Sequence, residues 1–84
     1  MAIRTNDIKK GWRIQQHNGW YGTMMDNRKG NLRMAEVEGA YTETGDIYAH
    51  EIRRACDPAT GIWHDIEYTP SQLELRARVH AFFY

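Results

Sequence analysis

Short runs in which apolar and polar side chains alternate recur between Trp12 and Tyr68 of this 84-residue chain. Alternation with a period of two is typical of half-buried β-strands, because successive side chains of a strand point to opposite faces. Gly, Asn and Pro separate these runs at the spacing expected of a β-barrel or a β-sandwich. This pattern constrains the fold more than any other feature, and it predicts a mainly β domain.

The predicted strands fill most of that segment. We expect them at Trp12–Gln16, Trp20–Met25, Leu32–Val37, in two short pieces of Tyr41–Tyr48 divided at Gly45-Asp46, at Ile52–Cys56 and at Ile62–Tyr68. The segment Asp57–Gly61, with Pro at its second position, predicts the turn that joins the last two strands as a hairpin.

The first hairpin leaves its register open. Asn18-Gly19 predicts a two-residue turn, since both residue types accept a positive φ. Such a turn places Ile14 opposite Thr23, whereas a barrel core would more naturally take Met24. A bulge near Gly22 reconciles the two, because Gly inside a strand often marks a bulge.

A helix start follows the last predicted strand. In Thr69-Pro70-Ser71-Gln72, Thr69 and Gln72 have the spacing of a capping box, and Pro70 occupies the first helical position. We expect a helix from Pro70 to about Phe82 with apolar surface on two sides, one of which caps the barrel. The aromatic tail Phe82–Tyr84 either docks on its own barrel or pairs in a homodimer through this helix.

Length and strand number narrow the architecture. A chain of 84 residues forms one domain, here 1–84. Five or six short strands are too few for an immunoglobulin-type sandwich, and a closed barrel removes exposed strand edges. We therefore expect an SH3-like small barrel of five or six short strands with a C-terminal α-helix.

One family pattern supports the barrel. Gly11 with Ile14, then Gly19 to Gly22-Thr23-Met24, and then a polar turn at Gly30 resemble the KOW type of SH3-like barrel, which occurs in ribosomal and transcription-elongation proteins. The resemblance covers about half of the chain, from Gly11 to Ile52, and departs from the family pattern at Gly39–Ile52 and in the helical tail. It implies contact with nucleic acid or ribonucleoprotein.

The sequence gives little support to an enzyme. No two of the histidines are spaced two to four residues apart, as a local metal-ligand pair would be; they are His17, His50, His64 and His80. Cys56 as a nucleophile would need His64 as a base across the last hairpin, and a small buried Cys is the commoner role. We expect no catalytic site, no metal and no cofactor.

Nucleic-acid binding is one candidate function. Basic side chains in and after one turn lie near two aromatic residues in sequence, and a pair of Arg follows on a later strand. In such a patch Arg would contact phosphate while a ring stacks on a base. The residues are Arg28, Lys29, Arg33, Trp20, Tyr21, Arg53 and Arg54. The formal net charge of +0 and the acidic stretch Glu36–Asp46 count against this interpretation.

Protein binding is the favoured function. The segment Tyr41–Tyr48 combines aromatic rings with carboxylates, which offers apolar contact and a rim that attracts cations. In a tight version, Trp20 or Tyr21 would join Tyr41 and Tyr48 as an aromatic cage for a methylated lysine or arginine. We predict a non-catalytic adaptor module that contacts another macromolecule, a protein first and a nucleic acid as the alternative.

The setting follows from absences in the sequence. A single cysteine, Cys56, suits a reducing compartment, and the first residues lack the apolar core of a signal peptide. No apolar run approaches the length of a membrane span. We expect a cytoplasmic accessory protein of a bacterium or its phage, with no membrane partner.

Overall fold

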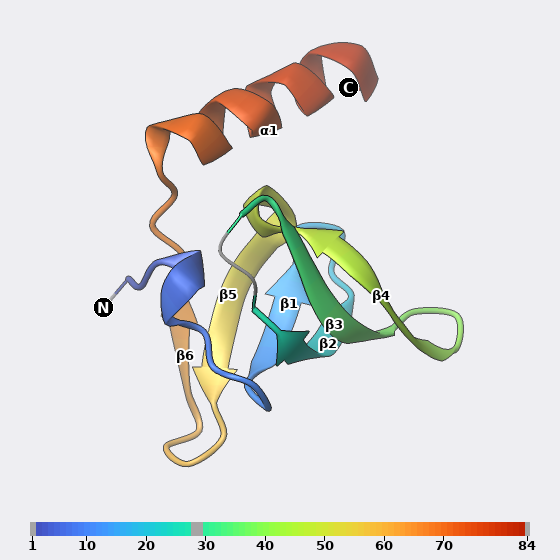
Figure 1. The fold of residues 1–84 in the computed structure, drawn as a ribbon, viewed down its shortest axis with the longest axis vertical. Helices are drawn as coiled ribbons and strands as arrows, with labels where there is room; N and C mark the ends of the chain where they lie inside the picture. Colours follow the sequence, from blue (N-terminus) through green and yellow to red (C-terminus); the bar gives the residue numbers. More distant parts are fainter. Residues whose placement is uncertain (1, 28–29, 84) are drawn as a thin grey trace.

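The computed structural model describes residues 2–27 and 30–83, the last five as helix backbone. In this range the chain forms an antiparallel sheet, two short 3-10 turns and a C-terminal helix (Figure 1). The elements are η1 (Thr5–Asp7), β1 (Arg13–Gln16), β2 (Tyr21–Asp26), β3 (Leu32–Glu38), β4 (Thr42–Tyr48), η2 (Ala49–Glu51), β5 (Ile52–Asp57), β6 (Ile62–Asp65) and α1 (Pro70–Phe83).

The strands form one six-stranded sheet in the order β4-β3-β2-β1-β5-β6. The prediction of a mainly β domain with a C-terminal helix is confirmed, but the closed barrel is wrong. Within the described residues β4 and β6 are the two edges of the sheet and do not pair with each other. The sheet stays open because its two edge strands have different neighbours. Just beyond β6 the chain pairs with Ile3 through a bridge to Ile66, whereas β4 leads through η2 into β5.

The first hairpin has a longer turn than predicted. Gln16 N–H donates to the Trp20 carbonyl at 2.9 Å, so the turn contains three residues and ends at Gly19, whose φ is +92°. This type of turn requires a left-handed residue at that position, which Gly supplies. Ile14 therefore lies opposite Gly22, and Met24 is fully buried without a bulge at Gly22.

Strand β4 is continuous, and its predicted division at Gly45-Asp46 is wrong. Gly45 lies in extended pairing with Ala35, in a register that runs unbroken from Leu32 opposite Tyr48 to Glu38 opposite Thr42. Interstrand hydrogen bonds hold the Gly in place despite its weak β propensity. The whole of Thr42–Tyr48 is therefore an edge strand.

The core lies on one face of the strongly twisted sheet. It consists of Ile8, Ile14, Met24, Ala35, Ile47, Ile52, Ala55 and Ile66, with Ile3, Trp12, Val37 and Tyr68 packed at its margin. Burial of such side chains is the main favourable contribution to folding. Because the sheet is open, this core ends near Val37 and Ile47, next to β4.

The predicted helix start is confirmed. Gln72 N–H donates to Thr69 Oγ1 at 3.3 Å, and Thr69 N–H donates to Gln72 Oε1 at 3.0 Å, which makes a reciprocal capping box. Helix α1 contacts η2 and stands over that end of the sheet (Figure 1). The side chains of Phe82 and Phe83 and the whole of Tyr84 lie outside the described residues, so the predicted docking or pairing of the tail does too.

Candidate binding groove

Three adjoining hollows form a groove beside β4, hereafter the β4 groove. Their volumes are ≈ 150, 220 and 540 Å³, and neighbouring hollows share lining residues: Trp20, Val37 and Glu43 between the first two, Gln16 and Asn18 between the last two. The remaining lining residues are Asn31, Gly39, Ala40, Tyr41, Gly45, Asp46, Ile47, Tyr48, His50, Glu51 and Leu75. The groove thus follows β4 from the β3–β4 turn to the first turns of α1.

Trp20 forms one wall of the groove. Its backbone N–H donates to Asn18 Oδ1 at 2.9 Å, which fixes the residue at the exit of the β1–β2 turn. Its ring lies against Gly39, where an added Cβ would be only 2.5 Å from the ring. The ring remains 49% exposed, so it presents apolar surface to the groove. A Gly at position 39 is therefore required for this ring position.

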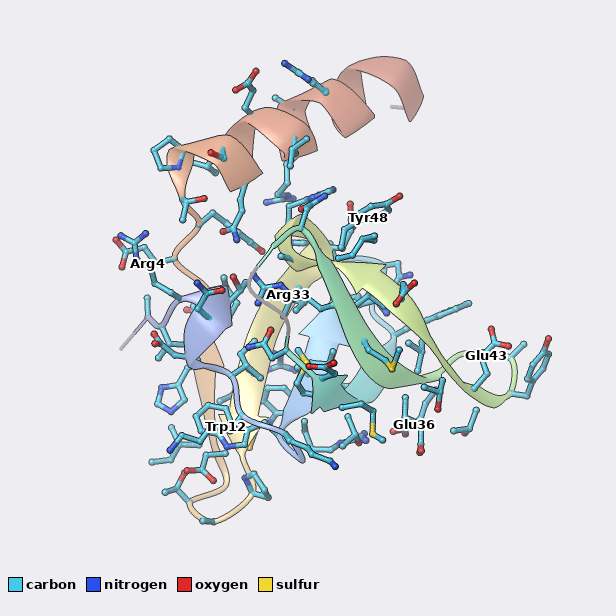
Figure 2. All side chains as sticks on the ribbon, viewed as in Figure 1. Arg4, Trp12, Arg33, Glu36, Glu43 and Tyr48 are labelled. Carbon is cyan, nitrogen blue, oxygen red and sulfur yellow. The ribbon has the colours of Figure 1, made fainter. Side chains whose placement is uncertain are left out.

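Carboxylates supply the charge of the β4 groove. Glu43 and Asp46 come from β4, and Glu51 comes from η2, which continues from that strand. Glu43 and Tyr48 lie toward opposite ends of β4 (Figure 2). Among the described residues that line the groove, none is Lys or Arg. The side chains that line the groove therefore carry a net negative formal charge, which favours cations over anions as ligands.

His50 lies at the α1 end of the groove, only 3% exposed. Its Nδ1 lies 3.1 Å from Asn31 Oδ1, and its ring stacks on Tyr48 at 5.3 Å. Since Asn31 Oδ1 accepts, Nδ1 carries the proton and Nε2 of the neutral ring presents a lone pair. Nε2 has no hydrogen-bond partner among the described residues.

The neighbours of His50 define what this end can bind. Burial lowers the pKa of His50, while Glu51 raises it and Arg76 lowers it further. Glu51 Oε1 lies 3.5 Å from His50 Nε2, so two acceptors face each other when the ring is neutral. Because Nε2 is buried, the part-exposed carboxylate of Glu51 is the acceptor that a donor group at this end can reach.

The structure separates the aromatic residues predicted from sequence. It brings Trp20 and Tyr41 together at one end of the groove and places Tyr48 at the other end. Tyr21 lies on the opposite face of the sheet, edge-on to Trp63 with ring centroids 5.9 Å apart. The predicted cage is therefore not assembled as one site, although three of its candidate rings line one groove.

Arg33 does not lie on a surface. It is 2% exposed and points inward between β3 and η1 (Figure 2). Its guanidinium donates to the Gly30 carbonyl at 2.7 Å, to Asn6 Oδ1 at 2.8 Å and to Asn27 Oδ1. Burial lowers the pKa of Arg33. The residue ties the N-terminal segment to the β2–β3 connection and is not placed to contact a phosphate.

Of the other predicted basic residues, only Arg53 and Arg54 are described, and neither forms a surface patch with the buried Arg33. Arg28 and Lys29 lie outside the described residues, and Arg53 is exposed on β5. On the face of the sheet opposite the core, Arg13 forms an ion pair with Glu38, which lowers the pKa of that carboxyl. Arg54 on the same face donates to Gln15 Oε1 at 2.6 Å and lies 4.5 Å from the Trp63 ring centre. These cations are already engaged within the domain.

The pair of Cys56 and His64 is not formed. In the β5–β6 ladder Cys56 lies opposite Trp63 and His64 lies opposite Ala55, so the two side chains point to opposite faces of the sheet. No group of three or more potential metal ligands occurs among the residues that the structure describes.

Another hollow, of ≈ 300 Å³, lies at the start of α1 beside Arg33. Its strongest donors are already used. Arg33 bonds to neutral oxygens of its own domain, and Gln72 donates from its backbone to Thr69 and from its side chain to Thr5 Oγ1 at 3.0 Å. This hollow is therefore less suited to a ligand than the β4 groove.

Sequence reasoning missed the His50 end of the groove. Asn31, His50 and Glu51 meet only because β4 is continuous and η2 folds back beneath α1. The one signal was local: an isolated His followed by an acidic residue directly after the aromatic–acidic segment Tyr41–Tyr48.

In comparisons with known proteins, no family model, curated protein or solved structure matches this chain. No described helix has the length and apolar content needed to cross a membrane.

Proposed function

We propose that this chain is a non-catalytic binding module whose β4 groove takes an extended, positively charged segment of a partner protein. The observation that carries the proposal is the make-up of the groove. Three aromatic residues that are about half or more exposed, Trp20, Tyr41 and Tyr48, line it together with carboxylates, and no described Lys or Arg does.

Physical chemistry connects this lining to a basic partner. Exposed aromatic rings supply apolar contact and attract cations through their negative faces. Carboxylates such as Glu43 and Asp46 select a cationic partner and speed its association. A groove that follows a whole strand suits an extended segment better than a compact small molecule.

A direct test uses two peptides of equal length and β propensity. The first is acetyl-Lys-Val-Lys-Val-Lys-Val-Lys-amide, the KV peptide; the second replaces each Lys by Glu, the EV peptide. We expect calorimetry at low salt to detect binding of the KV peptide alone. Equal binding of both peptides, or binding of single-stranded RNA without binding of the KV peptide, would overturn the proposal.

Matched variants locate the binding. The double substitution E43Q/D46N removes both carboxylates of β4, one from each face of the strand, and should weaken binding of the KV peptide roughly fivefold. The control D65N/E67Q removes two exposed carboxylates at and just beyond the end of β6 and should leave the affinity unchanged. The reverse result would place the site elsewhere.

An uncharged variant tests the aromatic wall. In Gly39→Ala the new Cβ displaces the Trp20 ring, and we expect about threefold weaker binding of the KV peptide. Gly30→Ala is the control, because an added Cβ there meets nothing within 4 Å. Unchanged affinity in Gly39→Ala would remove Trp20 from the site.

A further inference from the structure

The two edges of the sheet differ in how they are covered. Beyond β6, Ile3 N–H donates to the Asp65 carbonyl at 2.9 Å, and Glu67 N–H donates to the Ile3 carbonyl at 2.7 Å. Within the described residues no segment pairs in this way with the outer edge of β4. Uncovered edges present rows of unpaired backbone groups, which proteins normally avoid.

The register shows which backbone groups of β4 point outward. Ala49 N–H donates to the Asn31 carbonyl at 2.6 Å, and Gly39 N–H donates to the Tyr41 carbonyl at 3.3 Å. These bonds flank the ladder at both ends, and hydrogen-bonded pairs alternate along an antiparallel ladder. The odd-numbered residues of β4 therefore bond to β3. The N–H and carbonyl groups that point outward belong to Thr42, Thr44, Asp46 and Tyr48.

The β4 groove runs along this same edge. Its hollows are lined in turn by Tyr41 and Glu43, by Gly45 and Ile47, and by Tyr48. At Gly45 an added Cβ would meet nothing within 4 Å, so no side chain covers the groove face at the middle of the strand. Space and unpaired backbone groups therefore coincide over the length of one strand.

We propose that the partner segment binds as an added β-strand, pairing through its backbone with the outer edge of β4. This inference rests on the proposed function and specifies its binding mode. In strand addition, backbone hydrogen bonds supply affinity and the flanking side chains supply specificity. Here Glu43 and Asp46 project to opposite faces of β4, so basic side chains on either face of the added strand meet a carboxylate.

The charge of β4 favours a basic partner over a second copy of this chain. The strand Thr42–Tyr48 contains two carboxylates and no basic residue. Pairing two such strands edge to edge would bring like charges together, which is destabilising. A basic segment of another protein relieves the same repulsion.

Amide hydrogen exchange with and without the KV peptide tests the inference. We expect the peptide to slow exchange at Thr44 and Asp46, whose N–H groups point outward, by about tenfold or more at saturation. Gly45 and Ile47, already bonded to β3, should change far less. Equal changes at odd and even positions would overturn strand addition. So would slow exchange of Thr44 and Asp46 that appears without peptide and depends on protein concentration, because a second copy of the chain would then occupy the edge.

Backbone methylation of the peptide separates the binding mode from the function. N-methyl groups on alternate amides leave charge and side chains intact. Alternate N–H groups of an added strand point toward β4, and the others point to solvent. Methylation of the first set should weaken binding about tenfold by removing hydrogen bonds to β4, and methylation of the second set should have little effect. Binding that is insensitive to both sets overturns strand addition and leaves the proposed function standing; no binding of the unmodified KV peptide overturns both.

Discussion

Gly22 allows β2 and β3 to approach closely, since an added Cβ would lie 2.7 Å from the Glu36 carbonyl oxygen. We predict that Gly22→Ala lowers the free energy of unfolding by about 1–3 kcal/mol through this clash. Gly45→Ala is the matched control, because its Cβ meets nothing within 4 Å, and it should raise stability by roughly 0.5 kcal/mol. Urea denaturation followed by circular dichroism measures both, and equal stabilities would contradict the β2–β3 contact.

Arg33 ties β3 to η1 and to the β2–β3 connection through neutral oxygens of Asn6, Asn27 and Gly30. Lys cannot reproduce a fork of this kind, so buried acceptors are left unpaired. We predict that Arg33→Lys costs about 2–3 kcal/mol in the free energy of unfolding. Arg53→Lys, at an exposed position, should cost less than about 0.5 kcal/mol and serves as the control. Equal effects in urea denaturation would contradict the structural role.

The sequence pattern could place Arg33 on a face but not inside the protein. Period-two alternation groups Arg33 with Ala35 and Val37, and the structure confirms that grouping. The pattern does not tell which face is the core, because an Arg normally marks the exposed side. Its burial depends on partners distant in sequence, Asn6 and Asn27, which no local pattern indicates.

At the scale of elements, the helix start rests on a reciprocal pair of side chain–backbone hydrogen bonds. We predict that Thr69→Ala lowers the free energy of unfolding by about 1 kcal/mol, because one N-terminal N–H of α1 loses its acceptor. Thr69→Ser keeps the hydroxyl and should retain most of the stability. Thermal unfolding of both variants measures the difference. If Thr69→Ala has the stability of the wild type, α1 does not depend on its cap.

Elements that depend on interactions between residues close in sequence could be predicted. Elements that depend on pairing with a distant strand were predicted less well. Thr69 and Gln72 are three residues apart, so the capping box was visible in the sequence. The division of β4 at Gly45 was wrong because the strand is held by β3 and not by its own propensity. The predicted first turn was one residue too short, because Asn18-Gly19 also fits the three-residue turn ending at Gly19 that the structure contains.

The open sheet is a property of the whole molecule. Whether edges meet depends on twist and on segments far apart in sequence, such as Ile3 beyond β6, so strand count alone could not decide closure. The aromatic–acidic segment Tyr41–Tyr48 was singled out from the sequence as a candidate binding surface, but its position on an edge strand could be known only from the strand order. The binding role of these residues stays a prediction.

Stability of the folded chain should depend on pH through His50. Burial lowers its pKa from the ordinary value of 6.5, so the unfolded chain binds the proton more readily. The free energy of unfolding is therefore highest above that value and falls as the pH drops through the lowered pKa. Glu51, Arg76 and Tyr48 interact with the ring, and all three are unchanged in the variant that tests this dependence.

The variant His50→Gln isolates this contribution. Urea denaturation at about pH 8 and about pH 5 should show a smaller loss of stability in the variant than in the wild type. An identical loss in both proteins would mean that the ring does not titrate in this range.

The β4 groove can be located directly by mapping backbone amide chemical shifts during titration with the KV peptide. We predict that the largest changes fall on β4, on the β1–β2 turn around Trp20 and on His50 and Glu51. Changes centred on the opposite face, around Tyr21 and Trp63, would contradict it.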